Sequence, residues 1–383
     1  MQILEQITIF SRASLFHLCR LEIQPSIVLT NDWFGGFASA WKKLKSFGDY
    51  FDATKFYHII HNLGEEYQGR IYLDPHESVE FYSMEIEIPS ELIYDDNWND
   101  KILNPSRCAL LCSDHWGTVS KSYKKEILES SDLLYLLKKF EDPFAYPNGI
   151  RSADLFPIFE ALPSHDVQKK ELISKFFEIE LSESELAESI LFGFIGRISF
   201  QKGVKLIIDV IEPILKITNN KSFFIIAGPI DNSEYSIECS TRLKELMKAY
   251  PKNVWADPDV FFNEGKKLQL GSDFMLIPSL YEPGGLVQHE SFFAGTPVIS
   301  FKTGGLKDSV HEWNSSTLEG NGFLFESHVK ESLQDAFVKA INVFGKPSKY
   351  KILRDNASKS YIDLKQEGQA WRGELHRILG KVF

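Results

Sequence analysis

The sequence predicts an α/β protein made of two doubly wound domains, each built on a mostly parallel sheet. Short apolar runs that stop at polar or glycine residues alternate with longer stretches of helical periodicity, which is typical of parallel strands joined by helices. The runs are apolar at successive positions, as expected of strands that helices cover on both faces. A charged helical segment at 156–189 interrupts the alternation, so the strands form two series and indicate two domains.

The first series lies in the N-terminal part of the chain. An amphipathic helix is expected near the start, because Ile3, Ile7 and Phe10 recur at helical spacing. Around Cys108–Ser120, RCALLCS is interpreted as a buried strand with both thiols on one face, and WGTVS as its continuation or a further strand. The strands of this series are expected at Ser26–Asp32, Phe56–Asn62, Cys108–Ser120 and Phe144–Ile150.

The second series is more regular. Its strands are expected at Ile190–Gly196, Phe223–Gly228, Asn253–Asp257, Asp273–Ser279, Pro297–Phe301 and Gly322–Glu326. Its helices are expected at Val204–Ile217, Ser236–Ala249, Leu286–Ala294 and Lys330–Phe344. The predicted organisation is therefore an N-terminal domain at 1–155, a helical linker at 156–189, a C-terminal domain at 190–358, and a terminal helix at 359–383 that packs back on the first domain.

The composition excludes several classes of protein. A chain of 383 residues that is 43% hydrophobic can bury the cores of two domains. Its formal net charge of −11 argues against a general nucleic-acid binder, which needs a positive face. Four cysteines are too few for a disulfide framework, and no apolar run reaches the length of a membrane span. We expect a cytoplasmic protein.

A metal site is the alternative interpretation of the cysteine-containing segment. Cys108 and Cys112 lie near Asp114 and His115, which are all residue types that bind metals. However, neither Cys-x-x-Cys nor His-x-x-x-His spacing occurs there, so the buried strand is the simpler interpretation and no metal is predicted.

Chemically distinctive residues cluster where the predicted strands end. In open parallel sheets, ligands bind at the carboxyl ends of the strands. The clusters at these positions are Asn31–Asp32, His61–Asn62, Asn148–Gly149, Gly196–Arg197, Gly228, Glu282–Gly285 and Thr303–Gly305. This shared placement predicts one ligand site better than any single motif does.

Two of these clusters suggest phosphate binding. In GRISFQKG, Arg197 and Lys202 flank a loop that opens a helix, and cations beside free backbone N–H groups can bind a diphosphate. In TGGLKD, glycines allow the backbone to approach an anion closely. The alternatives are solvated surface charges for the first loop and a tight turn with positive φ for the second.

The remaining clusters suggest sugar binding. Glu282 and Glu290 carry carboxylates that can accept bonds from vicinal hydroxyls, although acids near a helix N-terminus are often only dipole-stabilising. His61 stands at a strand end, where the alternative is a structural histidine. Asp32 could simply precede a helix and its core aromatics.

Seven segments occur in an order that resembles a known family. They are PSIVLTNDWFGGFASA, IIHNLGEEYQGR, WGTVSKSYKKEIL, YPNGIRSADLFP, GRISFQKG, IPSLYEPGGLVQHE and GTPVISFKTGGLKDSV. Together they resemble the bacterial glycogen synthase and plant starch synthase family, whose members have two Rossmann-like domains in the GT-B arrangement. The resemblance runs over nearly the whole chain.

The resemblance implies a hexosyltransferase that moves glucose, with retention, from ADP-glucose or UDP-glucose to the 4-OH end of an α-1,4-glucan. It places the nucleotide-sugar donor in the C-terminal domain and the acceptor side in the N-terminal one. No metal or other cofactor is implied, because cations at the diphosphate can offset the charge that develops there. The alternatives are a catalytically impaired nucleotide-sugar-binding or glucan-binding paralogue or fragment, and a transferase acting on another glycan.

The resemblance also implies residue roles. Arg197 and Lys202 would hold the donor diphosphate, and Glu282 would face the reacting glucose. His61 would contact the sugar at its reacting end. The other implied contacts are amides of Thr303, Gly304 and Gly305 at the diphosphate, amides of Gly284 and Gly285 at sugar hydroxyls, Glu290 at the ribose, and Asp32 and Asn148 close to the sugar.

Three departures from the family pattern stand out. Gly284 occupies a position where family members carry a cysteine, and Arg151 one where they carry an aspartate. No Lys-x-Gly-Gly segment precedes Asn31–Trp33. The N-terminal domain is therefore expected to lack its first strands.

Overall fold

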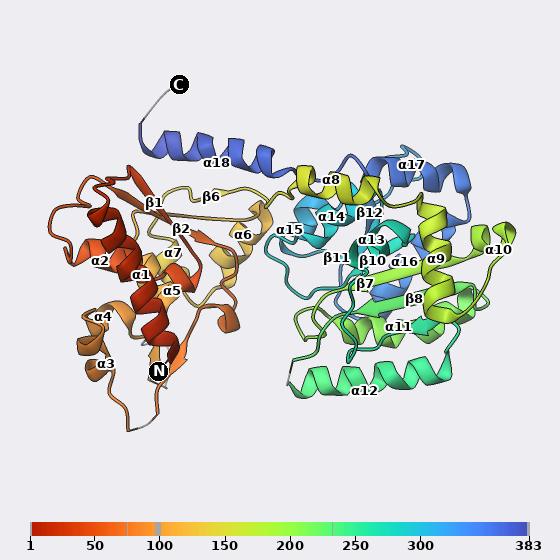
Figure 1. Cartoon of the computed structure of the whole chain (residues 1–383), viewed down its shortest axis with the longest axis horizontal. Coiled ribbons are helices and arrows are strands. Elements are labelled where there is room, and N and C mark those ends of the chain that lie inside the picture. The colour runs from red at the N-terminus through yellow and green to blue at the C-terminus, as the bar shows by residue number, and fades with distance from the viewer. Residues whose placement is uncertain (1, 75, 96–100, 232, 381–383) are drawn as a thin grey trace. The chain divides into compact units, whose positions relative to one another are not determined.

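The computed structural model describes residues 2–74, 76–95, 101–231 and 233–380, which form two compact units (Figure 1). Unit 1 comprises Met1–Pro147 and Gly368–Phe383, and unit 2 comprises Asn148–Glu367. The division falls at Pro147, ahead of the expected boundary near residue 155. The helical segment at 156–189 lies within unit 2. No described helix has both the length and the apolar character needed to cross a membrane.

The sheet of unit 1 has four parallel strands in the order β1-β2-β5-β6. The register pairs Leu29 with Tyr57 and Ile59 with Gly117. Since β1 and β2 are parallel neighbours, the residues that follow them emerge side by side at one edge of the sheet. The strands are β1 (Ile27–Asn31), β2 (Lys55–Ile60), β5 (His115–Thr118) and β6 (Phe144–Ala145).

Helices cover one face of this sheet. Buried side chains such as Leu4, Trp41 and Phe56 join them in one core, and Ile60 and Trp116 belong to a second cluster. The helices are α1 (Gln2–Arg20), α2 (Ala38–Lys43), α3 (Val79–Glu85), α4 (Ser90–Ile93), α5 (Pro105–Cys112), α6 (Lys121–Ser130) and α7 (Leu134–Leu137). A short antiparallel pair, β3 (Ile71–Tyr72) and β4 (Ile102–Leu103), was not predicted.

The segment RCALLCS is helix α5, so its interpretation as a strand was wrong. Asn104 caps the helix by accepting a 3.0 Å hydrogen bond from the N–H of Arg107, and Pro105 stands in the first turn, where its missing N–H is harmless. A short run that is apolar all round does not distinguish a buried helix from a buried strand. Cys108 and Cys112 still share a face, because residues four apart in a helix are neighbours.

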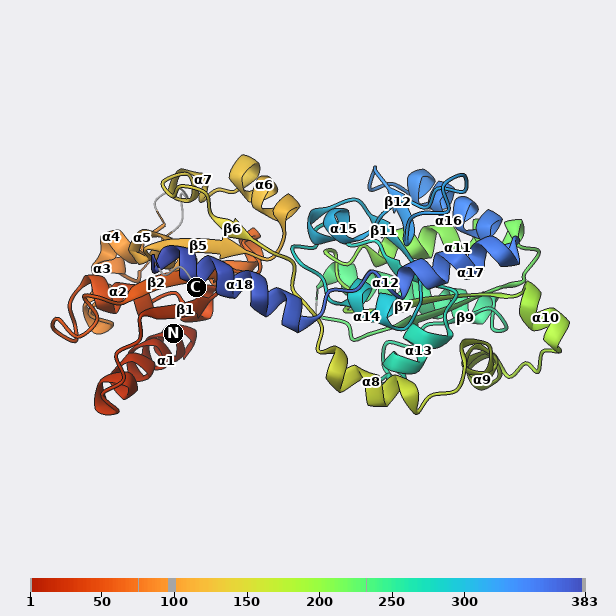
Figure 2. The same ribbon diagram turned by 90° about the horizontal axis from the view of Figure 1, so that it is seen from above.

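The opposite face of the unit 1 sheet is covered by α18 (Leu364–Ile378), whose residues from Gly368 belong to unit 1 (Figures 1 and 2). The ring of Trp371 packs edge to face against Tyr57 and Phe144, at centroid distances of 5.7 and 4.9 Å. The buried Glu374 accepts two hydrogen bonds from Arg377, at 2.7 and 2.9 Å. The helix thus brings the counter-charge for its own buried carboxylate.

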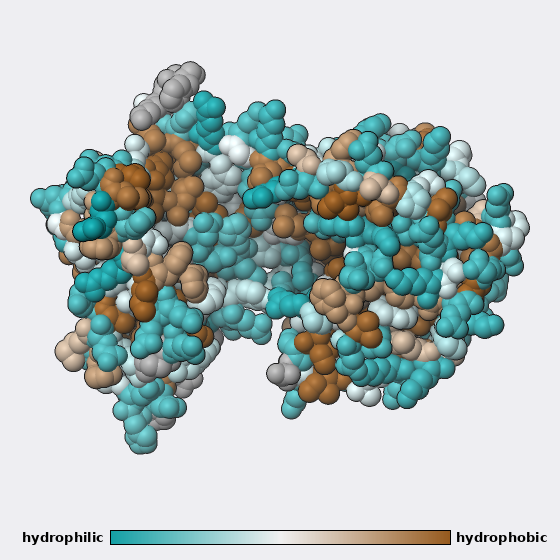
Figure 3. Space-filling model, in the orientation of Figure 1, coloured by the Kyte–Doolittle hydropathy of each residue, from teal (hydrophilic) through white to brown (hydrophobic). Residues whose placement is uncertain are grey.

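Strand β1 is an edge strand. It pairs with β2 on one side and with no described strand on the other. None of its five residues is charged, and Leu29 is 43% exposed. Figure 3 shows apolar surface gathered over the region of β1 and α18 in unit 1. An uncharged, partly apolar edge is a site where a further strand can add.

Unit 2 is built on six parallel strands in the order β12-β11-β10-β7-β8-β9. The chain starts at the central strand β7 and adds β8 and β9 on one side. It then returns to the other side of β7 for β10, β11 and β12, so the strand order reverses between β7 and β10. The strands are β7 (Ile190–Ile195), β8 (Ser222–Ala227), β9 (Val254–Trp255), β10 (Phe274–Ile277), β11 (Val298–Phe301) and β12 (Gly322–Phe325). Five of them lie within the predicted ranges, and β8 begins one residue before its range, at Ser222.

Both faces of this sheet are buried, as the continuous apolar runs predicted. Alternate residues face opposite cores, with Phe192 and Phe224 on one side and Leu191 and Ile225 on the other. The first core contains α11 (Val204–Ile217), α12 (Glu234–Ala249) and α16 (Lys330–Phe344). The second contains α9 (His165–Phe177), α13 (Gly265–Gly271), α14 (Val287–Phe293) and α15 (Gly304–Ser309). Figure 1 shows α11 and α12 on the side of the strands opposite α9 and α13. The remaining helices are α8 (Ser152–Glu160), α10 (Glu183–Glu188) and α17 (Pro347–Ala357).

A buried charge network ties the outer helices to the start of β10. Asp273 is 1% exposed, and its carboxylate lies 2.8 Å from Lys169 Nζ on α9. The same carboxylate accepts hydrogen bonds from Tyr350 Oη on α17 (2.8 Å) and from the N–H of Leu191 (2.7 Å). Burial by itself raises the pKa of Asp273. Lys169 and His165 outweigh that effect, so the pKa lies far below its ordinary value.

We expect Asp273→Asn to lower the free energy of unfolding by about 3–5 kcal/mol at neutral pH, because it leaves Lys169 buried without its counter-charge. Since the folded pKa is depressed, the ionised carboxylate contributes fully above the ordinary carboxyl pKa of about 4, and this contribution is lost as pH falls toward the folded value. Denaturant titrations should show the difference from wild type shrinking below about pH 4. Asp259→Asn, which breaks the exposed 2.6 Å pair with Lys244, is the control and should have little effect. If the loss of unfolding free energy in Asp273→Asn did not change with pH, this account would be contradicted.

We expect the wild-type chain to self-associate through β1, and Leu29→Lys to weaken that association, because a lysine on an edge strand opposes strand addition. Light scattering over a concentration series measures this. The control is Met84→Lys, a substitution at a side chain on α3 that is 72% exposed. Equal association of both variants would show that the edge is not used.

Candidate functional site

Most of the predicted site residues of unit 2 lie on three loops that follow adjacent central strands. Arg197 and Lys202 follow β7, Glu282 follows β10, and Thr303–Gly305 follows β11. These strands are neighbours, in the order β11-β10-β7, at the point where the strand order reverses. This is the position at which open α/β sheets bind ligands.

The first loop is fixed against the second. Gly203 begins α11 with φ +65°, and a Cβ there would lie 2.2 Å from the carbonyl oxygen of Pro278. Gln201, which is 7% exposed, accepts a 2.8 Å hydrogen bond from the N–H of Leu280 and donates one of 3.2 Å to the carbonyl of Tyr281. The sequence did not single out Gln201, although it stands beside Lys202 within GRISFQKG.

The two loops meet through a pair of predicted site residues. Lys202 Nζ lies 2.5 Å from Glu282 Oε2, with side-chain exposures of 21% and 12%. Arg197 donates a 3.4 Å hydrogen bond to Gln201 Oε1. The sequence assigned Lys202 to a diphosphate and Glu282 to a sugar. The structure places these two side chains in direct contact.

The third loop packs on the second at glycine positions. A Cβ on Gly304 would lie 2.2 Å from the carbonyl oxygen of Glu282, and one on Gly305 would lie 2.4 Å from that of Gly284. The N–H of Gly305 donates to the Glu282 carbonyl at 2.8 Å, and the N–H of Thr303 donates to Phe301 at 3.0 Å. These two amides, predicted to cradle an anion, are used within the protein. The glycines are therefore required here for close approach between loops.

The backbone of the Gly284–Gly285 turn is held in place by the side chain of Gln288. This side chain is fully buried and donates hydrogen bonds to the carbonyls of Gly284 (3.0 Å) and Gly285 (3.2 Å). Gly285 has φ +66°, which favours glycine. Gln288 lies within the quoted segment IPSLYEPGGLVQHE, but sequence reasoning did not single it out.

Glu290 lies on α14, and its side chain contacts α13. Its Oε2 atom accepts a 2.8 Å hydrogen bond from Gln269 Nε2 and lies 2.7 Å from Lys266 Nζ. Neither partner was among the predicted residues, because a contact between two helices far apart in sequence leaves no local signal. Asn148 stands at the start of unit 2, and the described contacts do not join it to the three loops.

In unit 1, Asp32 organises the end of β2. Its Oδ1 accepts hydrogen bonds from the backbone N–H groups of His61 (2.7 Å) and Asn62 (3.2 Å). The His61 ring lies 2.9 Å, Nε2 to Oδ1, from Asn31. Burial raises the pKa of the Asp32 carboxyl, and the nearby His61 opposes this effect. Asp32 also adopts φ +46°, a strained conformation of a kind that is frequent at functional sites.

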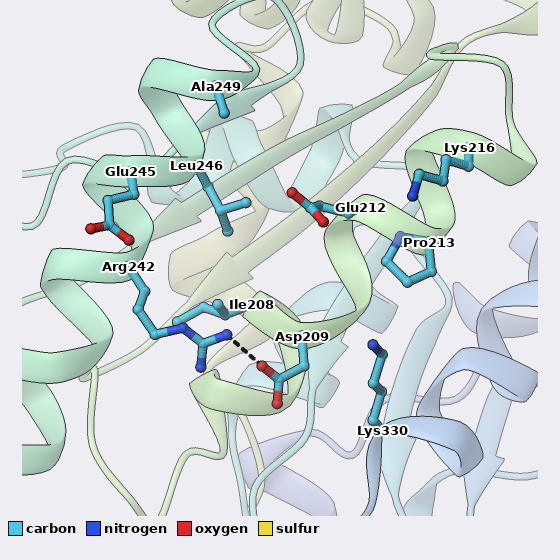
Figure 4. Close-up of a pocket in the computed structure, with 10 residues that line it drawn as sticks. All are labelled: Ile208, Asp209, Glu212, Pro213, Lys216, Arg242, Glu245, Leu246, Ala249 and Lys330. Atoms are coloured by element: carbon cyan, nitrogen blue, oxygen red, sulfur yellow. Dashed lines mark hydrogen bonds and ion pairs between the residues drawn. The ribbon is translucent and has the colours of Figure 1, made fainter.

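A groove elsewhere in unit 2 is lined by none of the predicted site residues. It has a volume of about 490 Å³ and lies between α11 and α12 (Figure 4). Within it, Arg242 donates a 2.6 Å hydrogen bond to Asp209. Its acidic and basic side chains balance, and it has no aromatic lining, so it does not have the character of a diphosphate or sugar site. The charged residues are Asp209, Glu212, Glu245, Lys216, Arg242 and Lys330.

The described residues contain no group of three or more His, Cys, Asp or Glu side chains arranged to hold a metal. In particular, Cys108 and Cys112 are both buried in α5. The three-loop cluster instead offers cations and one carboxylate, a set suited to an anionic sugar derivative.

Comparisons with known proteins match both halves of the chain. The model of the starch synthase catalytic domain matches residues 2–139, and that of glycosyl transferases group 1 matches residues 177–359. Glycogen synthase of Mycoplasma mobile is 30% identical over 353 residues, covering 88% of this chain and 70% of that protein. Glycogen synthase of Thermosipho melanesiensis is 29% identical, covering 98% of this chain and 77% of that protein.

Solved structures show the same fold. The catalytic domain of starch synthase IV from Arabidopsis thaliana, bound to ADP and acarbose, aligns with a TM-score of 0.78 and 23% identity, covering 98% of this chain and 76% of that one. Anabaena Alr3699/HepE, in complex with UDP and glucose, aligns with a TM-score of 0.58 and 16% identity, covering 91% of this chain and 77% of that one. The fold is that of the GT-B glycosyltransferases. With sequence matches in both halves and glycogen synthases as relatives, the chain belongs to the glycogen synthase family of hexosyltransferases.

Proposed function

We propose that the chain transfers glucose from ADP-glucose or UDP-glucose to the 4-OH end of an α-1,4-glucan, with retention of configuration. The observation that carries the proposal is the contact between Lys202 and Glu282, at 2.5 Å, on loops that follow the two strands where the sheet order reverses. A nucleotide sugar has its diphosphate and its reacting sugar one bond apart, so it needs a cation and a hydroxyl acceptor this close together.

The donor is supported by the charges of the site and by the structural neighbours. Arg197 and Lys202 supply two cations on one loop, and Gln201 links this loop to the one that carries Glu282. Starch synthase IV is described with ADP, and Alr3699/HepE with UDP and glucose. We therefore assign the diphosphate to Arg197 and Lys202, and the glucose hydroxyls to Glu282.

The proposed reaction places negative charge on the departing diphosphate and positive charge on the glucose ring. Lys202 and Arg197 would stabilise the first, and a carboxylate beside the ring would stabilise the second. If Lys202 turned toward the diphosphate, Glu282 Oε2 would lose its ion-pair partner and could accept bonds from the sugar. The same lysine would thereby couple arrival of the diphosphate to exposure of the carboxylate.

The proposed contribution of unit 1 is His61, presented at a strand end by Asp32 through the backbone bonds described above. In this proposal His61 contacts the reacting sugar, while Asp32 and Asn148 lie near it. Thr303 and the glycine turns shape the donor site, mainly by letting the loops approach each other. No metal is needed, because the two cations supply the positive charge.

Removing either cation should weaken donor binding. We expect Arg197→Ala and Lys202→Ala each to raise the KM for the nucleotide sugar by roughly tenfold to a hundredfold, the usual effect of losing a hydrogen bond to a charged group. Calorimetry with ADP and UDP should show the same loss. Lys205→Ala is the control, because Lys205 is half-exposed at the start of α11, just after this loop, and pairs with Glu238 at 2.9 Å. If neither Arg197→Ala nor Lys202→Ala weakens nucleotide binding, the assignment of the diphosphate to these residues is wrong.

Replacing the carboxylate should impair turnover more than nucleotide binding. We expect Glu282→Gln, which keeps the side-chain shape, to lower kcat by about a hundredfold or more, with ADP or UDP binding retained, because the lost charge acts on the developing transition state. Glu238→Gln on the surface is the matched control. A variant that turns over normally would show that Glu282 does not face the reacting sugar.

Transfer should survive chelation. Because cations of the protein are proposed to stabilise the diphosphate, incorporation of labelled glucose into glycogen should be unchanged in excess EDTA. Activity that disappears with EDTA and returns with Mn²⁺ would contradict the metal-independent mechanism.

A further inference from the structure

The carboxylate of Glu290 is held in place by a neighbouring helix. Lys266 Nζ lies 2.7 Å from Glu290 Oε2, and Gln269 Nε2 donates to the same oxygen at 2.8 Å. Both partners belong to α13, whereas Glu290 belongs to α14. Two donors on one oxygen fix the orientation of the carboxylate more firmly than either donor could alone.

Helix α13 is a rigid platform for these two donors. Leu268 is fully buried in the core, and Gln269 is 2% exposed. The backbone carbonyl of Gln269 accepts a 2.7 Å hydrogen bond from Thr296 Oγ1. This bond holds the backbone of Gln269, whose side chain is held by burial. The rotamer of Gln269 is thus set by packing, and it sets the position of Glu290 in turn.

The arrangement leaves one carboxylate oxygen available. Both contacts are made to Oε2, and the described residues provide no hydrogen-bond partner for Oε1. The side chains of Lys266 and Glu290 are 31% and 27% exposed, so a ligand in solution can reach them. A charged oxygen with a fixed direction and solvent access is suited to accept a hydrogen bond from a hydroxyl.

We infer that Lys266 and Gln269 are positioning residues that orient Glu290 toward the ribose of the donor nucleotide. They would thereby set the preference of the site for ribonucleotides over 2′-deoxyribonucleotides. The inference rests on the proposed function, because the nucleotide is assigned to unit 2 there. It adds two residues from a helix that no sequence motif covers.

The test uses binding of ADP and 2′-deoxy-ADP, and of UDP and 2′-deoxy-UDP, to the full chain, measured by calorimetry, which does not depend on turnover. Lys266→Met keeps the side-chain length and removes the charge. We expect it to weaken ADP or UDP binding by about fivefold, the size of a partly exposed ion pair, and to leave the 2′-deoxy nucleotide nearly unchanged. In kinetics, KM for the nucleotide sugar should rise while kcat stays within about twofold.

Two further variants complete the design. Lys267→Met is the matched control, because Lys267 is the next residue of α13 and pairs with Glu264 at 2.9 Å instead. Glu290→Gln should abolish the difference between ribose and deoxyribose. In Glu290→Gln, adding Lys266→Met should have no further effect on that difference, since the lysine acts through the carboxylate.

The outcomes separate the inference from the proposed function. If Lys266→Met alters unfolding temperature but not the ribose preference, the lysine is structural only and the inference is overturned. If Glu290→Gln leaves the ribose preference intact while Arg197→Ala still weakens binding, the inference fails and the diphosphate assignment stands. If neither Arg197 nor Glu290 affects nucleotide binding, both are wrong.

Discussion

The close approach of the Thr303–Gly305 turn to the Glu282–Gly285 turn is the constraint on which the rest of the site depends. Any side chain at Gly304 would occupy the place of the Glu282 carbonyl, and the Gly305 amide bonds to that same carbonyl. This contact fixes the backbone of Glu282, and Lys202 fixes its side chain. The position of one carboxylate thus depends on two glycines that follow the neighbouring strand β11.

Much of unit 2 could be predicted because its strands and helices obey simple patterns. Val204–Ile217 and Lys330–Phe344 were predicted with the bounds that the structure gives, since each helix has one apolar face directed at the same core. The α5 segment was not, because a run that is apolar all round has no periodicity to separate helix from strand. Local patterns were informative for helices with one apolar face and for the strands of unit 2, and uninformative for a short helix that is apolar all round.

The candidate site was also predictable only in part. Loop residues at strand ends were predictable, because the topology brings adjacent strand ends together whatever the side chains do. The contacts that these residues make with other parts of the chain could not be predicted. Lys266, Gln269 and Gln288 act across elements, and the use of the Gly305 amide within the protein depends on a spacing that only the folded backbone has. The network around Asp273 is another example, since it joins α9, α17 and β10 from separate parts of the chain.

The placement of α18 determines the order in which the molecule can be completed. A ribosome makes the chain from its N-terminus, so every strand of unit 1 leaves the exit tunnel before Trp371 does. The aromatic face formed by Tyr57 and Phe144 must therefore wait, uncovered, while all of unit 2 is translated. Unit 2 has its own two cores and can form during that interval. The domain whose strands are made first is thus finished last, and until α18 is made its aromatic face is exposed apolar surface of the kind that favours aggregation.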